Sequence, residues 1–473
     1  MSQFSRRAFL RAASATVATP FALNLAALGQ AAAANAVNDY KALVCIFLAG
    51  GNDPFNTVLA TDPDSWEQYS KLRTTNNGSL SIALPRAESS GGVLPIHPVN
   101  SQGRSFALHP QLGVMQNMFD NGRMAIVANV GTLLAPITRT QYRAGLYVPS
   151  KLFSHNDQQS MWQAYAPEGA RTGWGGRIGD LLAANNTDPT FTCVSVAGSA
   201  VFLSGQSIIP YQIAPSGTLA IRNLNGNLFG ARGANNTLRA IISGNRNDVF
   251  EKDHANIVNR SINAQSTLAA AMAPAGAAGV PDPTLYQNPV TGVWASNPLA
   301  QQLQAVARII AGRNSLGARR QVFYVSLPGF DTHDAQRAQH ADLMAKLAHA
   351  VAYFDGLMGN LMGSDLRNQV TSFTASEFGR TFTSNGDGSD HGWGNHHFVF
   401  GGAVRGKDIY GSFPVTGIGH DLDVGSGALL PTLAVEQYAA TLAAWFGLSG
   451  SQIATVFPNL SRFSGANLGF MQA

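Results

Sequence analysis

The stretch Lys41-Ala-Leu-Val-Cys-Ile-Phe-Leu48, which runs into Ala49-Gly50-Gly51-Asn52-Asp53, decides the fold class of this chain. A continuous apolar run of this length is typical of a strand buried on both faces of a parallel sheet. Similar runs occupy residues 124–130, 321–327 and 369–374, and residues 397–400 are a fifth candidate. The sequence therefore predicts several buried strands of one sheet.

Helical patterns separate these runs. Apolar residues recur at helical spacing over residues 299–310, 343–361 and 435–445. Strands that alternate with helices of this length predict an α/β fold, in which helices flank a mostly parallel central sheet. We expect residues 37–473 to form one such domain. The stretch around residues 184–298 mixes short apolar runs with Asn, Gly and Ser, so it is expected to be an insertion that caps the sheet.

The composition excludes several classes of protein. Of the 473 residues, 45% are apolar and 12% are charged, which excludes a disordered polar chain, and two cysteines are too few for a disulfide scaffold. Residues 1–36 hold three of the 31 Lys and Arg residues and none of the 27 acidic residues, which leaves 28 basic residues against 27 acidic ones. This balance gives no argument for nucleic acid as a partner.

The first residues predict where the protein works. Ser5-Arg6-Arg7-Ala8-Phe9-Leu10-Arg11 precedes an alanine-rich apolar run that ends in Ala33-Ala-Asn-Ala36. Twin arginines, an apolar run and small residues at a cleavage site are typical of a twin-arginine export signal, here residues 1–36. The alternative is a basic N-terminal helix on a cytoplasmic protein. With no later segment long enough for a membrane span, we expect a periplasmic or secreted protein.

Acidic residues follow three of the predicted strands. Asp53 comes after the first, Asp331 after the run at residues 321–327, and Glu377 after the run at residues 369–374. Ligands of open parallel sheets collect at the carboxyl ends of the strands. An acid at such a position can also cap the following helix or turn. Three acids at three strand ends nevertheless favour a shared site.

Histidines are concentrated near the same strand ends. His333 lies two residues beyond Asp331, and His391, His396 and His397 lie in a glycine-rich stretch that follows Glu377. Carboxylates mixed with imidazoles suit Zn²⁺, Mn²⁺ or Fe better than Ca²⁺, which takes oxygen ligands. Surface histidine clusters also arise without a ligand, and this alternative stays open.

Ser154 and Arg380 are the candidate catalytic residues. Ser154 stands at the start of a predicted helix, whose amides favour an anion. It is a candidate nucleophile, or it is simply the N-cap of that helix with Asp157 completing the turn. Arg380 follows Glu377 closely and is expected to pair either with a carboxylate inside the protein or with a substrate oxyanion.

Motifs along nearly the whole chain resemble the twin-arginine-exported bacterial family called domain of unknown function 1501. The matching segments are Phe47-Leu-Ala-Gly-Gly-Asn-Asp53, Leu108-His-Pro-Gln-Leu112, Ser154-His155 with Gln158, Gly173-Trp174, Phe330-Asp-Thr-His333, Ser376-Glu-Phe-Gly-Arg-Thr381, Asp390-His-Gly392 and Val404-Arg-Gly-Lys407 with Tyr410-Gly411. That family is similar to the alkaline phosphatase and sulfatase superfamily, whose members hold two metals at the strand ends of an α/β sheet. The resemblance implies an alkaline phosphatase-like fold.

The resemblance also implies roles for single residues. Asp53 would be the metal ligand of the first strand, Ser154 the nucleophile, and Asp331 with His333 the pair on one metal. Glu377 stands where the superfamily has an Asp-His pair, which removes one imidazole, and His391 or His396 would supply the last one. This departure leaves a one-metal site open. A Cys-x-Pro-Ser-Arg segment is absent, so the formylglycine type of sulfatase is not supported.

These observations predict an exported, metal-dependent hydrolase of phosphate or sulfate esters. The expected metal is zinc, with manganese or magnesium as alternatives, and the expected ligands are Asp53, Asp331, His333, Glu377, His391 and His396. A small anionic ester or a component of the cell envelope is the expected partner. One alternative is a non-catalytic envelope protein for binding or assembly that retains the hydrolase fold. Another is an exported protein whose histidines only buffer or scavenge metal.

Overall fold

The computed structural model describes most of the chain beyond the predicted signal. The described residues are 40–74, 81–221, 224, 231, 233–244 and 247–472, so the predicted export signal at residues 1–36 lies outside them. Lys41–Ala473 form one compact unit.

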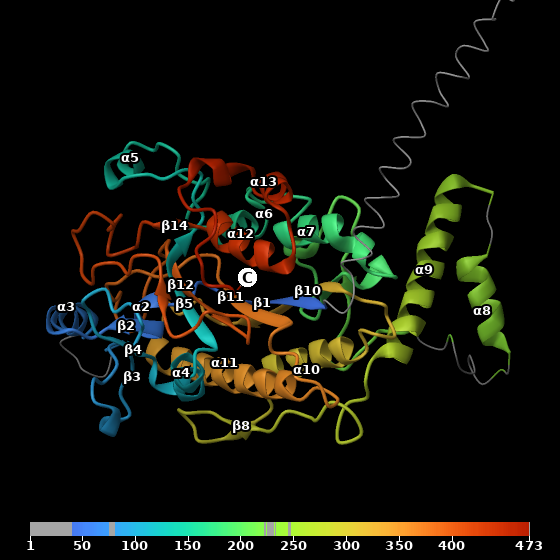
Figure 1. Ribbon diagram of the computed structural model, residues 1–473, viewed down its shortest axis with the longest axis horizontal. Helices are drawn as coiled ribbons and strands as arrows, with labels where there is room; N and C mark the ends of the chain where they lie inside the picture. Colours follow the sequence, from blue (N-terminus) through green and yellow to red (C-terminus); the bar gives the residue numbers. More distant parts are fainter. Residues whose placement is uncertain are drawn as a thin grey trace, which may run out of the picture. The chain divides into compact units, whose positions relative to one another are not determined.

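A central sheet of nine strands organises the described residues (Figure 1). The strands run in the spatial order β13-β5-β12-β11-β1-β10-β6-β7, and β14 also pairs with β5. Among the described strands of this sheet, only β12 is antiparallel to its neighbours, which are β11 and β5. The remaining pairs of strands are parallel. The strands are β1 (Lys41–Ala49), β5 (Met124–Gly131), β6 (Cys193–Ser195), β7 (Tyr211–Gln212), β10 (Arg320–Pro328), β11 (Val370–Ala375), β12 (Asn395–Phe400), β13 (Ile409–Tyr410) and β14 (Leu433–Ala434).

The predicted fold class is confirmed: a mostly parallel sheet has helices on both faces. All five apolar runs form strands of this sheet, and the central ones are buried along nearly their whole length because helices cover both faces. One face packs against α4 (Gly113–Asp120) and α10 (Pro298–Ala311), and α11 (Gln336–Gly359) packs against both of these helices on the same side (Figure 1). The other face packs against α7 (Trp174–Leu182) and α12 (Val435–Phe446); on that side α6 (His155–Ala164) packs against α7, and α13 (Gly450–Val456) packs against α7 and α12.

The stretch expected to be a capping insertion contributes to two regions. Its first part adds β6 and β7 to the edge of the central sheet. Its second part holds α8 (Ala234–Ser243) and α9 (Val249–Ala271), which pack against each other, and the hairpin of β8 (Tyr286–Gln287) and β9 (Trp294–Ala295).

The remaining elements lie in the loops around the sheet. A small antiparallel sheet contains β2 (Val58–Ala60), β3 (Leu94–Ile96) and β4 (Phe106–Leu108), and the short helices are α2 (Pro54–Thr57), α3 (Pro63–Arg73) and α5 (Arg139–Arg143). Among the described helices, none has both the length and the apolar character that crossing a bilayer requires.

Candidate functional site

The loops that follow three neighbouring strands meet at the edge of the sheet formed by the carboxyl ends of those strands. Because β1, β10 and β11 are parallel, their carboxyl ends share this edge. In the turn after β1, the Gly50 amide donates to Oε1 of Glu377 at 2.9 Å. A Cβ on Gly50 would lie 2.2 Å from the backbone nitrogen of Asp331, so only glycine allows this approach. The turn therefore brings the acids that follow β10 and β11 together.

Three imidazoles surround the carboxylate of Asp331. Oδ1 lies 3.2 Å from Nε2 of His391 and 3.1 Å from Nε2 of His333, and Oδ2 lies 3.3 Å from Nε2 of His155. The Nε2 atoms of His333 and His391 are 3.0 Å apart. The Asp331 side chain keeps 43% of its surface exposed, so the cluster is open to solvent on one side.

His155 enters the cluster from α6, of which it is the first residue. Its Nδ1 atom lies 3.0 Å from Oε1 of the buried Glu377, and Gln159, one turn further along α6, donates to the same oxygen at 3.0 Å. Glu377 is therefore a buried anchor that orients His155, rather than a group that faces the open side of the cluster.

Hydrogen bonds at the far ring nitrogens assign the lone pairs of two histidines. Nδ1 of His155 faces the Glu377 carboxylate, and Nδ1 of His391 lies 2.8 Å from the carbonyl oxygen of Phe153. Both partners are acceptors, so in each neutral ring the proton belongs on Nδ1 and the lone pair on Nε2. Two lone pairs and a carboxylate then point at one another, an arrangement that a bound cation or an added proton stabilises.

The pKa values of the cluster follow from these contacts. The hydrogen bond with Glu377 raises the pKa of His155, despite the opposing effect of burial. Burial alone would raise the pKa of Asp331, but the hydrogen bond from Arg380 and the positive charge of Arg380 bring it below its ordinary value. Burial lowers the pKa of His391. An ionised carboxylate beside a neutral His391 is the state in which both side chains can hold a metal.

Three of these residues meet the geometric requirements of a metal site. The ligand atoms of His155, Asp331 and His391 all lie within 4.8 Å of one another. Two imidazoles and one carboxylate are a typical donor set for Zn²⁺ and for other borderline divalent cations. The acceptors at the two Nδ1 atoms are the outer contacts that orient ligating histidines. The residues therefore fit a divalent metal.

Arg380 serves an interior carboxylate, the first of the two expected partners. Its buried guanidinium donates to Oδ1 of Asp331 at 3.0 Å. The other donors are used by backbone carbonyls: Gly50 accepts at 3.1 Å, and Ser389 accepts from both Nε and Nη2. Arg380 thus holds Asp331 in place, and its donors are occupied within the protein.

Ser154 is the N-cap residue of α6, but its hydroxyl does not cap the helix. The hydroxyl instead donates to Oδ2 of Asp157 at 2.9 Å. Its chain neighbours Phe153 and His155 both contact the cluster. Ser154 therefore lies beside the cluster, with a carboxylate in position to accept the proton of its hydroxyl.

The structure leaves two of the expected ligands outside the cluster, which corrects the predicted group. Asp53 is fully buried, and its carboxylate accepts hydrogen bonds from Arg73, the shortest at 2.6 Å, and from Gln336 at 2.5 Å. His396 is also buried, because it lies within β12 among strands that helices cover, and its Nδ1 accepts from the backbone amide of Asn129 at 3.0 Å. Proximity to a strand end does not by itself bring a side chain into the cluster, because the direction of the side chain decides whether it reaches the other ligands.

Sequence reasoning missed His155 and Gln159. Both lie in the first turns of α6, where roles were predicted from the sequence only for Ser154 and Asp157. The one signal that pointed to His155 was the Ser154-His155 segment among the motifs that resemble the family. His333, which was expected as a ligand, lies at the exposed side of the cluster, where its Nδ1 is 3.3 Å from Oδ1 of Asp390.

The fold and the site define an α/β protein with a carboxylate and imidazole cluster at the carboxyl edge of its sheet. A family model described as "Protein of unknown function (DUF1501)" matches residues 40–456. The chain belongs to this family. No curated protein sequence matches the chain significantly.

Solved structures align with this chain over most of its length, but distantly. One is described as "Ps i-CgsB in complex with k-i-k-neocarrahexaose"; it has 10% identity and a TM-score of 0.35, and the alignment covers 91% of this chain and 78% of that one. Another, from work on glycosaminoglycan metabolism by Bacteroides thetaiotaomicron and labelled "BT33494S-sulf", has 10% identity and a TM-score of 0.34, with coverages of 87% and 74%. At these TM-scores the similarity decides neither the fold nor the activity.

Proposed function

We propose that this protein is an exported, metal-dependent hydrolase of phosphate or sulfate esters. The observation that carries the proposal is that His155, Asp331 and His391 come together at the carboxyl ends of the strands. The anionic substrate class rests on the family resemblance and on the positive charge that a metal would bring to this edge. The periplasmic or secreted location rests on the twin-arginine pattern of residues 1–36.

The three residues would hold the metal through Nε2 of His155, a carboxylate oxygen of Asp331 and Nε2 of His391. When bound, a divalent cation lowers the pKa of an attacking hydroxyl and neutralises charge on the ester oxygens. Zinc suits this donor set best, and manganese and magnesium are alternatives.

The protein's own groups prepare the site for this chemistry. Glu377 and the carbonyl of Phe153 keep the lone pairs of both histidines directed toward Asp331. Arg380 fixes the carboxylate. Ser154 is the proposed nucleophile: its oxygen would form a bond to the phosphorus or sulfur atom while the bond from that atom to the ester alcohol breaks and the alcohol leaves. Asp157, which accepts the hydrogen bond of Ser154 at 2.9 Å, would receive the hydroxyl proton during attack.

Turnover of aryl phosphate and aryl sulfate esters, measured with added Zn²⁺, Mn²⁺ or Mg²⁺, tests the proposal. We expect one ester class to be hydrolysed only with metal, His391→Ala to lose both metal binding and turnover, and Ser154→Ala to lose turnover while retaining metal. Activity of Ser154→Ala equal to that of the unchanged protein would remove Ser154 from the mechanism. Absence of turnover with every metal would contradict the hydrolase assignment.

One observation supports the alternative of a non-catalytic envelope protein. The described residues contain a single three-ligand group, whereas the enzymes of the resembled superfamily hold two metals. A protein that binds one equivalent of metal tightly but hydrolyses neither ester would be an envelope protein for binding or assembly.

A further inference from the structure

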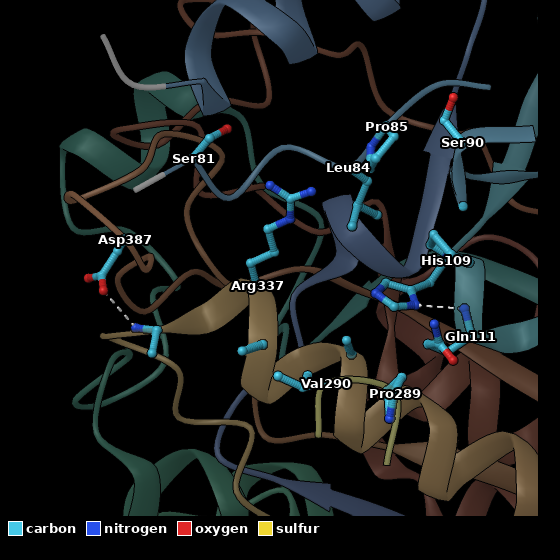
Figure 2. A pocket seen from close by; sticks show the side chains of 15 residues that line it. Ser81, Leu84, Pro85, Ser90, His109, Gln111, Pro289, Val290, Arg337 and Asp387 are labelled. Carbon is cyan, nitrogen blue, oxygen red and sulfur yellow. Dashed lines mark hydrogen bonds between the residues drawn. The ribbon is translucent and has the colours of Figure 1, made fainter. Parts of the chain in front are cut away.

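A cavity of about 550 Å³ lies beside the amino end of α11 (Figure 2). Its walls come from the segment before β3, the segment after β4, the turn between β8 and β9, the first turns of α11, and Asp387 in the segment between β11 and β12. The Asp331 cluster consists of Asp331, His155, His333 and His391, and none of these residues lines the cavity. The cavity is therefore separate from that cluster.

Unused hydrogen-bond donors gather at the start of α11. Ala335, the N-cap residue, has no side chain with which to cap the helix, and the amide of Gln336 donates to the Asp387 carbonyl. The next two amides, of Arg337 and Ala338, have no acceptor among the described residues, and both residues line the cavity. A helix start with free amides attracts an anion.

Arg337 adds a full positive charge to this wall. Its side chain is exposed, and it makes no ion pair or hydrogen bond within the described part of the chain. Figure 2 shows the guanidinium extending beside the cavity, across from His109. Asp387 is the one acidic residue of the lining, and its Oδ2 already accepts from the Ala335 amide at 3.0 Å.

His109 supplies an independent observation from the opposite wall. The residue is only 1% exposed, and its Nδ1 accepts from the amide of Gln111 at 3.1 Å (Figure 2). The proton of the neutral ring therefore belongs on Nε2, which has no partner among the described residues. Burial lowers the pKa of His109, so the ring is neutral at neutral pH. A buried donor without a partner is costly unless a ligand or water accepts from it.

We propose that this cavity binds an oxyanion: a sulfate, phosphate or carboxylate group held by Arg337, by Nε2–H of His109 and by the amides of Arg337 and Ala338. Guanidinium groups bind oxyanions through charge-assisted hydrogen bonds.

The cavity and the Asp331 cluster share two loops. His333 of the cluster is two residues before Ala335 of the cavity, a separation of at most about 7 Å along the chain. Likewise Asp390 contacts His333, and Asp387 contacts Ala335. An oxyanion in the cavity can therefore be a free ion, or it can be a second anionic group of a substrate whose ester lies at the cluster; this second case rests on the proposed function.

Calorimetric titration of metal-free protein with inorganic sulfate and with a sulfated disaccharide tests the proposal. We expect saturable binding of at least one probe, and at least a tenfold loss of affinity in Arg337→Ala. Arg260→Ala, which removes an exposed arginine from α9, is the matched control and should bind like the unchanged protein. Much tighter binding of the disaccharide would identify the oxyanion as part of a larger ligand.

His109→Asn is the second variant, because Asn retains an acceptor for the Gln111 amide but lacks the Nε2–H donor. We expect it to weaken binding several-fold, with an unchanged circular dichroism spectrum. No saturable binding of either probe, or equal affinity of Arg337→Ala and the unchanged protein, would overturn the proposal. Because the readout is binding without metal, these results do not depend on whether the protein is a hydrolase.

Discussion

Glu377 shows how a residue predicted to bind metal acts on the cluster through a neighbour. Oε1 of its buried carboxylate faces Nδ1 of His155, the Gln159 amide and the Gly50 amide, so it is already surrounded by protein donors. Its expected contribution is to fix the orientation and the proton position of His155.

Glu377→Gln should therefore weaken metal binding without abolishing it. A neutral amide loses the charged acceptor for Nδ1–H of His155, and loss of such outer partners lowers metal affinity by about 10-fold to 100-fold. Competition of the purified protein with a chelator of known affinity measures this change. Glu436→Gln, a buried carboxylate outside the cluster, is the control and should retain full affinity.

Asp53 caps the helix that follows β1, as the capping alternative predicted, since it is the N-cap residue of α2 and accepts from the Phe55 amide at 3.0 Å. It also has a second structural role, which the sequence did not reveal. Its carboxylate pairs with the guanidinium of Arg73, and both side chains are fully buried. Arg73 in turn lies over the rings of Phe55, Tyr69 and Phe382. The pair joins the loop after β1 to α3, so its charges are compensated inside a small aromatic core.

Asp53→Asn should cost about 3–5 kcal/mol in the free energy of unfolding, because it leaves a buried guanidinium without its counter-charge. Urea unfolding measures this cost. Asp365→Asn, which affects a largely exposed pair with Arg367, should cost less than about 1 kcal/mol. If folded Asp53→Asn protein lost its bound metal, Asp53 would have to be returned to the ligand set.

At the scale of elements, α12 carries a titratable group inside the core. Glu436 lies in its first turn and is 2% exposed, with a weak contact at 3.4 Å from Asn459. Burial raises the pKa of Glu436 to about 7, only partly offset by Asn459 and nearby arginines. The helix therefore packs best while this carboxyl is protonated.

The sign of the resulting pH dependence follows from the two pKa values. Between about pH 4.5 and pH 7, the unfolded chain has released the proton of Glu436 and the folded chain retains it, so the free energy of unfolding falls as pH rises. The loss is complete above pH 7 and is on the order of 3 kcal/mol. Glu436→Gln should remove this part of the slope, as measured by urea unfolding across the window. Identical slopes for the two proteins would contradict this account.

The positions of the strands along the chain were predicted better than their directions in the sheet. The runs at residues 41–48 and 124–130 form β1 and β5, since a buried strand needs apolar side chains on both faces. The last run also forms a strand, β12, but it is antiparallel to both neighbours. Apolar character reports burial and not strand direction, which depends on the path of the connecting loops.

At the scale of the whole molecule, metal binding should couple to stability. The cluster takes residues from the start of α6, from the loop after β10 and from the segment before β12, so it forms only when the sheet is assembled. A ligand that binds only the folded state stabilises it by about 2.7 kcal/mol at a concentration 100 times the dissociation constant.

Removal of metal by a chelator should accordingly lower the unfolding temperature, and added Zn²⁺ should restore it. Thermal unfolding followed by circular dichroism, with and without metal, measures this effect. His391→Ala is the control, because it lacks a ligand and its unfolding temperature should not respond to Zn²⁺. An equal response in both proteins would place the metal elsewhere.

The sequence by itself determined the α/β class, five strands of the central sheet, and the presence of acids and histidines at strand ends, because burial and local turn chemistry depend on neighbouring residues. The family membership was also visible in motifs spread along the chain. Only the tertiary structure separated Asp331 and His391, which share a site, from Asp53 and His396, which are buried elsewhere. It also brought in His155 from a helix that precedes Asp331 by more than 170 positions. The physical reason is that a ligand group depends on where side chains point after strands pair and loops close, and this long-range geometry has no local signature.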